Sequence, residues 1–290
     1  MAFGPTGDSE GTNVARRPGG VTVAPRSREA SPAQRRIVVI VPTRNESGTI
    51  AEVAQRVLAQ QEHLPHYRID LLVVDGLSTD GTPELVSEMS ASEPRIHSLA
   101  MDETGLGLAL LAAYAHAADD LAADVIAQLD ADLSHEPERL EAMLDALAEG
   151  FDLAIGSRFA PGGGMKNWPA SRHILCRGAN FLIRLLTGCW SIRDWTSGYR
   201  AFTVDLYRRL DIASINFRDY TLQPALVYEA VRCGARVCET PIIFTNRRWG
   251  KSKLPVLAYP TNLLRHFVGA RLRRLTSRTP APGRAVRVES

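Results

Sequence analysis

The sequence predicts an α/β fold with a mostly parallel central sheet flanked by helices. Short apolar runs alternate with helical stretches from residue 37 to about residue 160, and this order is typical of parallel strands joined by right-handed crossovers. Polar clusters follow the ends of four of these predicted strands. Since ligands of such sheets bind beyond the carboxyl ends of the strands, we expect the functional site at that edge.

The elements of this first part follow from local signals. Pro42 ends the first strand, Pro83 suits an early helical position, and Leu140, Met143 and Leu144 share one face of a helix. The predicted strands are 37–41, 69–74, 95–100, 125–129 and 152–156. The predicted helices between them are 49–61, 83–90, 107–121 and 138–148.

After residue 160 the alternation ends. Pro161–Gly164 reads as a flexible loop. The elements that follow are predicted as a helix over 171–187, a strand over 198–203, a helix over 221–233, a strand over 236–244 and a helix over 256–275. The predicted organisation is a disordered basic arm over 1–35, a catalytic domain over 36–255, an amphipathic helix within 256–277 and a disordered tail over 278–290.

Composition excludes several classes of protein. The 290 residues are 45% hydrophobic and 23% charged, as in an ordinary globular protein, and no apolar run approaches the roughly 20 residues of a membrane span. The N-terminus lacks the apolar region of a secretory signal, and the four cysteines form no Cys-x-x-Cys pair, so we expect reduced thiols in a cytoplasmic protein.

The net charge of +2 is unevenly distributed. Residues 1–36 carry +3 and residues 265–290 carry +6, so the body between them is acidic. An acidic body argues against a nucleic-acid partner. The basic ends could contact anionic lipid or act as solubilising tails.

The fourth predicted strand ends in two carboxylates one residue apart, Asp130 and Asp132. Side chains at positions i and i+2 of a strand point to the same side, so these two would converge. Like charges repel unless a cation lies between them, and Mg2+ or Mn2+ commonly shares carboxylate and phosphate oxygens. The pair therefore indicates either a metal–diphosphate site or a solvated turn.

Three further motifs each allow two interpretations. The Asp75–Thr82 turn could bind a nucleoside or only cap a helix, and the basic loop Arg247–Lys253 could close over a diphosphate or only solvate the surface. Apolar residues mixed with arginine over 171–187 and 257–275 could lie on an anionic membrane or pack on the core. Gly105-Leu-Gly107 lacks the third glycine of a dinucleotide fingerprint, which argues against an NAD enzyme.

Together these segments resemble the family 2 glycosyltransferases, and more narrowly the dolichyl- and polyprenyl-phosphate mannose synthases. The resemblance covers about residues 37–255, in family order. The segments that carry it are Val-Pro-Thr-Arg-Asn-Glu46, Val-Asp-Gly-Leu-Ser-Thr-Asp-Gly-Thr82, Gly-Leu-Gly107, Leu-Asp-Ala-Asp-Leu-Ser-His135, Ile-Gly-Ser-Arg158, Arg-Gly-Ala-Asn-Phe181, Asp-Trp-Thr-Ser-Gly-Tyr-Arg200 and Trp-Gly-Lys-Ser-Lys253.

The resemblance implies a GT-A fold, a nucleotide-sugar donor such as GDP-mannose, and Mg2+ or Mn2+. It places the nucleoside against Pro42, Arg44, Glu46, Val74, Asp75 and Gly76. It assigns the metal and diphosphate to Asp130, Ala131, Asp132 and Gln223, and phosphate contacts to Arg158, Arg200, Arg247 and Lys253. The family usually has a second Asp where this chain has Gly76, a Tyr near Arg44, and a Glu where this chain has Ala225.

The predicted reaction is inverting transfer of a hexose, most simply mannose, to a polyprenyl or dolichyl phosphate. Asp132, Arg200, Arg247 and Lys253 are the expected catalytic residues. The enzyme is expected on the cytoplasmic face of a membrane, in peripheral contact with the surface and with room for a membrane-protein partner. The alternatives are a GT-A enzyme with a soluble acceptor and a non-catalytic nucleotide-binding or scaffold protein.

Overall fold

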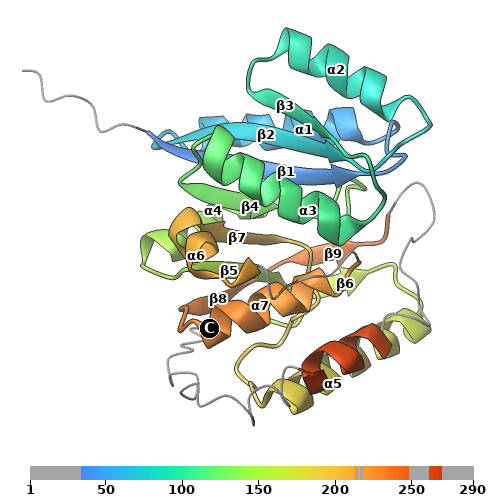
Figure 1. Ribbon diagram of the computed structural model, residues 1–290, viewed down its shortest axis with the longest axis vertical. Coiled ribbons are helices and arrows are strands. Elements are labelled where there is room, and N and C mark those ends of the chain that lie inside the picture. Colours follow the sequence, from blue (N-terminus) through green and yellow to red (C-terminus); the bar gives the residue numbers. More distant parts are fainter. Residues whose placement is uncertain (1–33, 213–214, 216–218, 248–260, 270–290) are drawn as a thin grey trace, which may run out of the picture. The chain divides into compact units, whose positions relative to one another are not determined.

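A seven-stranded sheet forms the centre of the molecule (Figure 1). The computed structural model describes residues 34–212, 215, 219–247 and 261–269. Within them the strand order is β3-β2-β1-β4-β7-β5-β8. The strands are β1 (Arg35–Thr43), β2 (Tyr67–Asp75), β3 (Ile96–Ala100), β4 (Val125–Gln128), β5 (Leu153–Ser157), β7 (Arg200–Thr203) and β8 (Val237–Pro241).

The sheet is mostly parallel, as predicted, with one reversed strand. β1 pairs in parallel with β2 and β4, and β5 pairs in parallel with β8. β7 lies between β4 and β5 and runs antiparallel to both. The chain leaves the sheet after β5, forms a long helix, and re-enters from the carboxyl edge, which gives β7 its direction.

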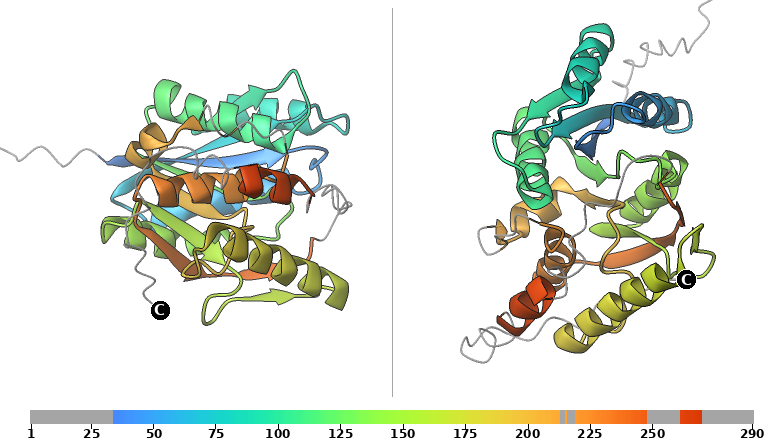
Figure 2. Two further views of the ribbon diagram at one scale, coloured as in Figure 1. Left: turned by 60° about the horizontal axis from the view of Figure 1, so that its bottom comes forward. Right: turned by 90° about the vertical axis from the view of Figure 1, so that its right-hand side faces the viewer.

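Helices cover both faces of the sheet (Figure 2). They are α1 (Ile50–Ala59), α2 (Thr82–Ser92), α3 (Leu106–Ala115), α4 (Leu140–Ala148), α5 (Ala170–Thr187), α6 (Val204–Arg209) and α7 (Leu222–Arg232). Alternate residues of β1 face opposite ways: Val38 and Ile40 pack with α3 and α7, whereas Val39 and Val41 pack with α1 and α4. The central strands are thus buried on both faces, which is why they read as unbroken apolar runs.

One prediction for the second half of the chain was wrong, and one strand was not predicted. The single strand expected over 236–244 is two strands, β8 and β9 (Ile243–Thr245). The predicted loop is present at residues 161–163, but it leads into an unpredicted strand, β6 (Gly164–Lys166). Pro241 ends β8, since its nitrogen carries no hydrogen for the ladder. β9 then pairs with β6 in a separate two-stranded sheet.

The C-terminal region is described only in part. Residues 261–269 are helical, inside the segment predicted as an amphipathic helix, with Leu263 and Phe267 buried and Leu264 and Val268 exposed. The arm before residue 34, Lys253, and the predicted tail lie outside the described residues. Across the described ranges, no helix combines the length and the apolar character that crossing a bilayer requires.

Candidate active site

Asp130 and Asp132 lie in a tight turn at the carboxyl edge of the sheet. β4 ends at Gln128, so the alternation expected from a strand does not orient them. Instead the backbone turns back through a left-handed conformation at Leu133 (φ 60°), and the amide of Ser134 donates to Asp132 Oδ1 at 3.1 Å. Both carboxylates still reach the same cavity, the first cavity of the site.

The Asp130 carboxylate is open to the cavity but surrounded by protein. Its side chain is 37% exposed, and its oxygens accept no hydrogen bond from the described residues. The low-dielectric surroundings, and then the charge of Asp132, raise its pKa, although the charges of Arg247 and Arg158 oppose this. A cation in the cavity would relieve this cost.

His135 packs against this turn and does not supply a positive charge to its carboxylates. Its side chain is fully buried, and burial lowers the pKa of the imidazole, so the ring is neutral at physiological pH. Nδ1 accepts a hydrogen bond from the Asp130 amide at 3.1 Å, which places the ring proton on Nε2. His135 is therefore a structural residue of the turn and not a base.

Arg247 supplies the permanent positive charge next to the carboxylates. Its Nη2 atom lies 3.2 Å from Asp132 Oδ2, and both side chains are mostly buried. Arg247 contributes to the walls of two adjoining cavities. The contact of Arg247 with a diphosphate stays a prediction, and Lys253 lies outside the described residues.

The first cavity collects most of the residues predicted to meet the nucleotide. Of these, Pro42, Arg44, Glu46, Gly76, Asp130, Ala131 and Asp132 line it. Val74 is instead buried in the core, and Asp75 does not reach the cavity lining because its carboxylate bonds Thr43 and Ser78. Thr43, Gly105, Leu106 and Arg247 also line it and belong to segments singled out in the sequence. The sequence did not indicate Thr104, Ala109, Asp219 and Tyr220, which complete the lining.

The rest of the Asp75–Thr82 turn works as a structural clamp. Burial alone would raise the pKa of Asp80, but hydrogen bonds from Thr82 and from the Ser47 amide outweigh it and lower the pKa. Asn45 accepts from the Thr79 amide at 2.8 Å. The turn-and-cap interpretation therefore describes these contacts, which fix the loop after β1 against the loop after β2.

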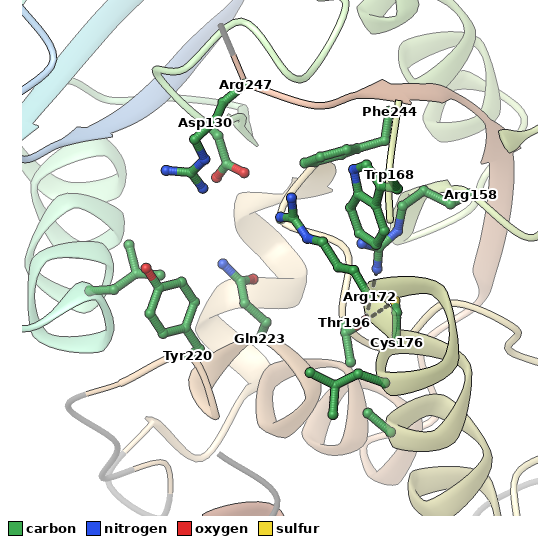
Figure 3. A pocket seen from close by; sticks show the side chains of 14 residues that line it. Asp130, Arg158, Trp168, Arg172, Cys176, Thr196, Tyr220, Gln223, Phe244 and Arg247 are labelled. Carbon is green, nitrogen blue, oxygen red and sulfur yellow. Dashed lines mark hydrogen bonds between the residues drawn. The ribbon is translucent and has the colours of Figure 1, made fainter. Parts of the chain in front are cut away.

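A second cavity adjoins the first and shares four of its residues: Leu106, Asp130, Tyr220 and Arg247 (Figure 3). Its other wall carries arginines and aromatic rings. Arg172 of α5 stacks on Trp168 with its guanidinium carbon 3.9 Å from the ring centre, and it donates to Asn246 at 2.9 Å. Burial and the nearby Arg247 and Arg158 lower the pKa of Arg172. Guanidinium groups held this close favour an anion between them.

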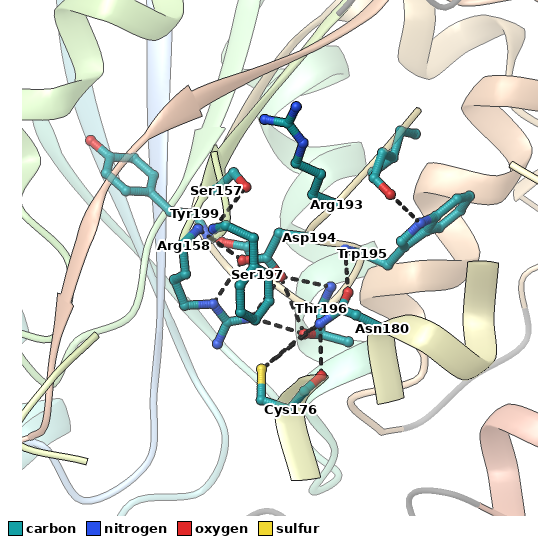
Figure 4. Close-up of polar contacts among 12 residues, drawn as sticks. Ser157, Arg158, Cys176, Asn180, Arg193, Asp194, Trp195, Thr196, Ser197 and Tyr199 are labelled. Carbon is teal, nitrogen blue, oxygen red and sulfur yellow. Dashed lines mark hydrogen bonds and ion pairs between the residues drawn. The ribbon is translucent and has the colours of Figure 1, made fainter. Parts of the chain in front are cut away.

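Arg158 reaches the second cavity from the end of β5, held by a buried carboxylate (Figure 4). Its Nε and Nη2 atoms each lie 2.7 Å from one oxygen of Asp194, and Nη2 also donates to Thr196 at 2.8 Å. Burial would raise the pKa of Asp194, but Arg158 outweighs this and lowers it. Asn180 of α5 accepts from the Trp195 amide at 2.7 Å, which ties the helix to the same loop.

Arg200 does not lie where the resemblance places it. It is fully buried in the central strand β7 and lines neither cavity. Its guanidinium donates to the main-chain oxygens of Gln223 (2.8 Å) and Ser197. Arg200 therefore supports the wall of the site, and the expectation of a direct phosphate contact is corrected.

Gln223, by contrast, lines the second cavity. The residue is buried, and its Oε1 atom has no hydrogen-bond partner within the described part of the chain. Among the described residues no group of three His, Cys, Asp or Glu side chains is placed to hold a metal. Of the residues that the resemblance assigns to the metal, the described structure thus offers the carboxylates of Asp130 and Asp132 and the amide of Gln223.

Comparison with known families matches residues 38–212 to the family described as Glycosyl transferase family 2. The chain belongs to this family. Curated relatives of this family 2 enzyme include a polyprenol monophosphomannose synthase from Mycolicibacterium smegmatis, 39% identical over 76% of this chain and 81% of that protein. An undecaprenyl-phosphate mannosyltransferase from Micrococcus luteus is 36% identical over 76% of this chain and 87% of that protein.

Solved structures support the GT-A-like α/β fold of this glycosyltransferase. Glucosyl-3-phosphoglycerate synthase from Mycobacterium tuberculosis superposes with a TM-score of 0.59 at 20% identity, over 82% of this chain and 80% of that one. A mannosyltransferase from Pyrobaculum calidifontis, solved with GDP-Man and Mn2+, gives a TM-score of 0.53 at 22% identity, over 87% and 68%. The GT-A prediction is confirmed.

Proposed function

We propose that this glycosyltransferase moves mannose from GDP-mannose to a polyprenyl phosphate at a membrane surface. The observation that carries the proposal is the pair of adjoining cavities that meet at Asp130. One is lined by carboxylates and the loops after β1 and β2, and the other by arginines and aromatic rings. The names of the two curated relatives point to the same sugar and the same class of lipid acceptor.

The first cavity suits the nucleoside diphosphate. At the border with the second cavity, Asp130, Asp132 and Gln223 would hold Mg2+ or Mn2+. These ions prefer oxygen donors, Asp130 is costly to ionise alone, and Gln223 Oε1 lacks a partner among the described residues. When bound, the ion supplies charge stabilisation to the departing diphosphate. Arg247 lies beside Asp132 and would add a second positive charge, with Lys253 on the same loop sequence.

The second cavity suits the acceptor phosphate. A phosphate monoester carries negative charge at neutral pH, so its oxygen needs positioning and not a general base. Arg158 and Arg172 would hold it near Asp130, where the cavities meet. Its oxygen would then attack the anomeric carbon as the bond to the diphosphate breaks, the nucleoside diphosphate leaves with the bonding electrons, and the configuration inverts.

Labelled GDP-mannose, incubated with polyprenyl phosphate and Mn2+, tests the proposal directly. We expect an acid-labile product that extracts into organic solvent, and loss of that product with excess chelator. Parallel reactions should contain UDP-glucose, or a soluble phosphate or sugar acceptor in place of the lipid. Transfer only to a soluble acceptor, or transfer that withstands the chelator, would contradict the lipid acceptor or the metal respectively.

A further inference from the structure

Helix α5 presents an apolar patch that no described residue covers. Ile174, Phe181 and Leu185 are 73%, 56% and 53% exposed, and their spacing places them on one face of the helix. Trp190, just past the helix, is 50% exposed, and its ring lies 5.9 Å from that of Phe181. An exposed group of large apolar side chains usually marks a surface that binds a partner.

An arginine pocket lies beside this apolar patch. It is lined by Phe159, Arg177, Asn180, Phe181, Arg184 and Arg193. Within the described residues, none of its three arginines forms an ion pair with a carboxylate. One reason is visible in the sequence: residues 159–193 contain four arginines and one lysine but no Asp or Glu. This surface is therefore positively charged on a chain whose body is acidic.

The arginine pocket is separate from the active site. Leu175, Cys176 and Ala179 of α5 line the second cavity, whereas Arg177, Phe181 and Arg184 line the arginine pocket. The helix thus stands between the two. The 261–269 helix lies at the same end of the described structure as α5 (Figure 1). Its residues Leu264 and Val268 are exposed apolar side chains.

We propose that α5 docks on an anionic bilayer, with the apolar patch at the level of the acyl-chain boundary and a lipid headgroup phosphate in the arginine pocket. Guanidinium groups pair with phosphate, and tryptophan and phenylalanine rings suit the interfacial region. The charge of the surface selects an anionic membrane over a neutral one. Binding to the bilayer does not itself depend on the proposed function. Only its consequence, that the second cavity is brought close to a lipid acceptor, rests on that function.

Flotation of the full chain with vesicles tests the proposal. One vesicle preparation is phosphatidylcholine alone, and the other is an equimolar mixture with phosphatidylglycerol; neither contains polyprenyl phosphate. Arg177→Gln is matched by Arg208→Gln on α6, since both arginines are exposed. Leu185→Ser is matched by Leu77→Ser, since these leucines are 53% and 47% exposed. The basic ends of the chain are the same in every variant.

We expect the unmodified chain to float with the anionic vesicles and far less with the neutral ones. Arg177→Gln should weaken binding about fivefold and Leu185→Ser about tenfold, while both control variants bind normally. The proposal is overturned if the unmodified chain ignores anionic vesicles, if it binds both preparations equally, or if the α5 variants bind as well as their controls.

The same variants separate this proposal from the proposed function. With a short-chain acceptor that needs no bilayer, Leu185→Ser should transfer mannose at the normal rate. A chain that docks on vesicles but transfers no mannose would contradict the function and leave the docking surface standing. A chain that transfers mannose to the short acceptor but does not dock would do the reverse.

Discussion

Asp130 and Asp194 are two aspartates in protein surroundings at the same edge of the sheet, and they are treated in opposite ways. Asp194 receives two hydrogen bonds from the Arg158 side chain and one from the Arg158 amide, and its pKa is lowered. Asp130 accepts no hydrogen bond from the described residues, and its pKa is raised. The fold therefore supplies hydrogen-bond donors to Asp194, which positions Arg158, and leaves the Asp130 carboxylate without donors from the described residues.

The sharpest test of this difference is Asp130→Asn. We expect mannose transfer to fall about 1000-fold, since Asp130 is one of the residues proposed to hold the ion that stabilises the departing diphosphate. The free energy of unfolding should stay the same or rise, because a poorly solvated carboxylate is removed. Transfer rates with Mn2+ and urea unfolding measure the two effects. If Asp130→Asn lowered the free energy of unfolding as much as Asp194→Asn, Asp130 would be stabilised by the fold in the same way as Asp194, contrary to the comparison.

Asp194→Asn should act mainly on stability. Removing one partner of a buried ion pair costs about 3–5 kcal/mol, because the Arg158 charge stays buried without compensation. Urea unfolding of the variant beside Asn180→Ala, which cuts neighbouring hydrogen bonds but leaves the ion pair, isolates the charge effect. Equal losses in the two variants would show that packing of the loop, and not the pair, is responsible.

Arg172 and Arg200 allow the same comparison for two arginines, one that lines a cavity and one that is fully buried. Arg172→Gln should lower kcat/KM for the lipid phosphate about 100-fold, or about 3 kcal/mol, with little change in stability, since Arg172 lines the second cavity. Arg200→Gln should unfold more easily, since Arg200 is fully buried and bonds two main-chain oxygens. If Arg200→Gln instead lowered kcat/KM for the lipid phosphate without loss of stability, Arg200 would contact the phosphate directly, against what its burial indicates.

The pH dependence of stability should have opposite signs at the two aspartates. The folded pKa of Asp194 lies below its ordinary value of 3.8, so its stabilising contribution is present above pH 3.8 and is lost as the pH falls through the folded value. The folded pKa of Asp130 lies above 3.8, so its penalty is absent below pH 3.8 and grows as the pH rises toward the folded value. Unfolding of each Asn variant against the unmodified chain, from acid to neutral pH, measures both slopes.

Gly198→Ala is the mildest perturbation. A Cβ atom there would lie 3.0 Å from Asp130 Oδ1, so the carboxylate must move by a few tenths of an ångström. We expect about a fivefold rise in the Mn2+ concentration needed for half-maximal transfer, equivalent to about 1 kcal/mol. Gly178→Ala is a suitable control, because its added Cβ would meet nothing within 4 Å. If both variants needed the same Mn2+ concentration for half-maximal transfer, the close approach of Gly198 to Asp130 would not matter for metal binding.

The sequence predicted the first half of the fold well because its signals are local. Apolar strands, Pro42 and Pro83 need no distant partner, and the acidic turn at Asp130 carries a motif. The second cavity was harder to predict. Trp168 and Phe244 are 76 residues apart in sequence, yet their rings lie 5.2 Å apart because β6 pairs with β9. Nothing in the local pattern around Pro161–Gly164 indicates that pairing, and Arg200 reads as a motif residue although it is buried.

The small β6–β9 sheet connects the walls of the two cavities. β6 leads into Trp168 and α5, which form the arginine-rich wall, while β9 leads through Asn246 to Arg247 beside Asp132. The Asn246 amide donates to the Lys166 oxygen, and the Asn246 side chain accepts from Arg172. A displacement of the β6–β9 sheet would move Arg172 and Arg247 together. Binding of a ligand in one cavity would then change the position of an arginine in the other.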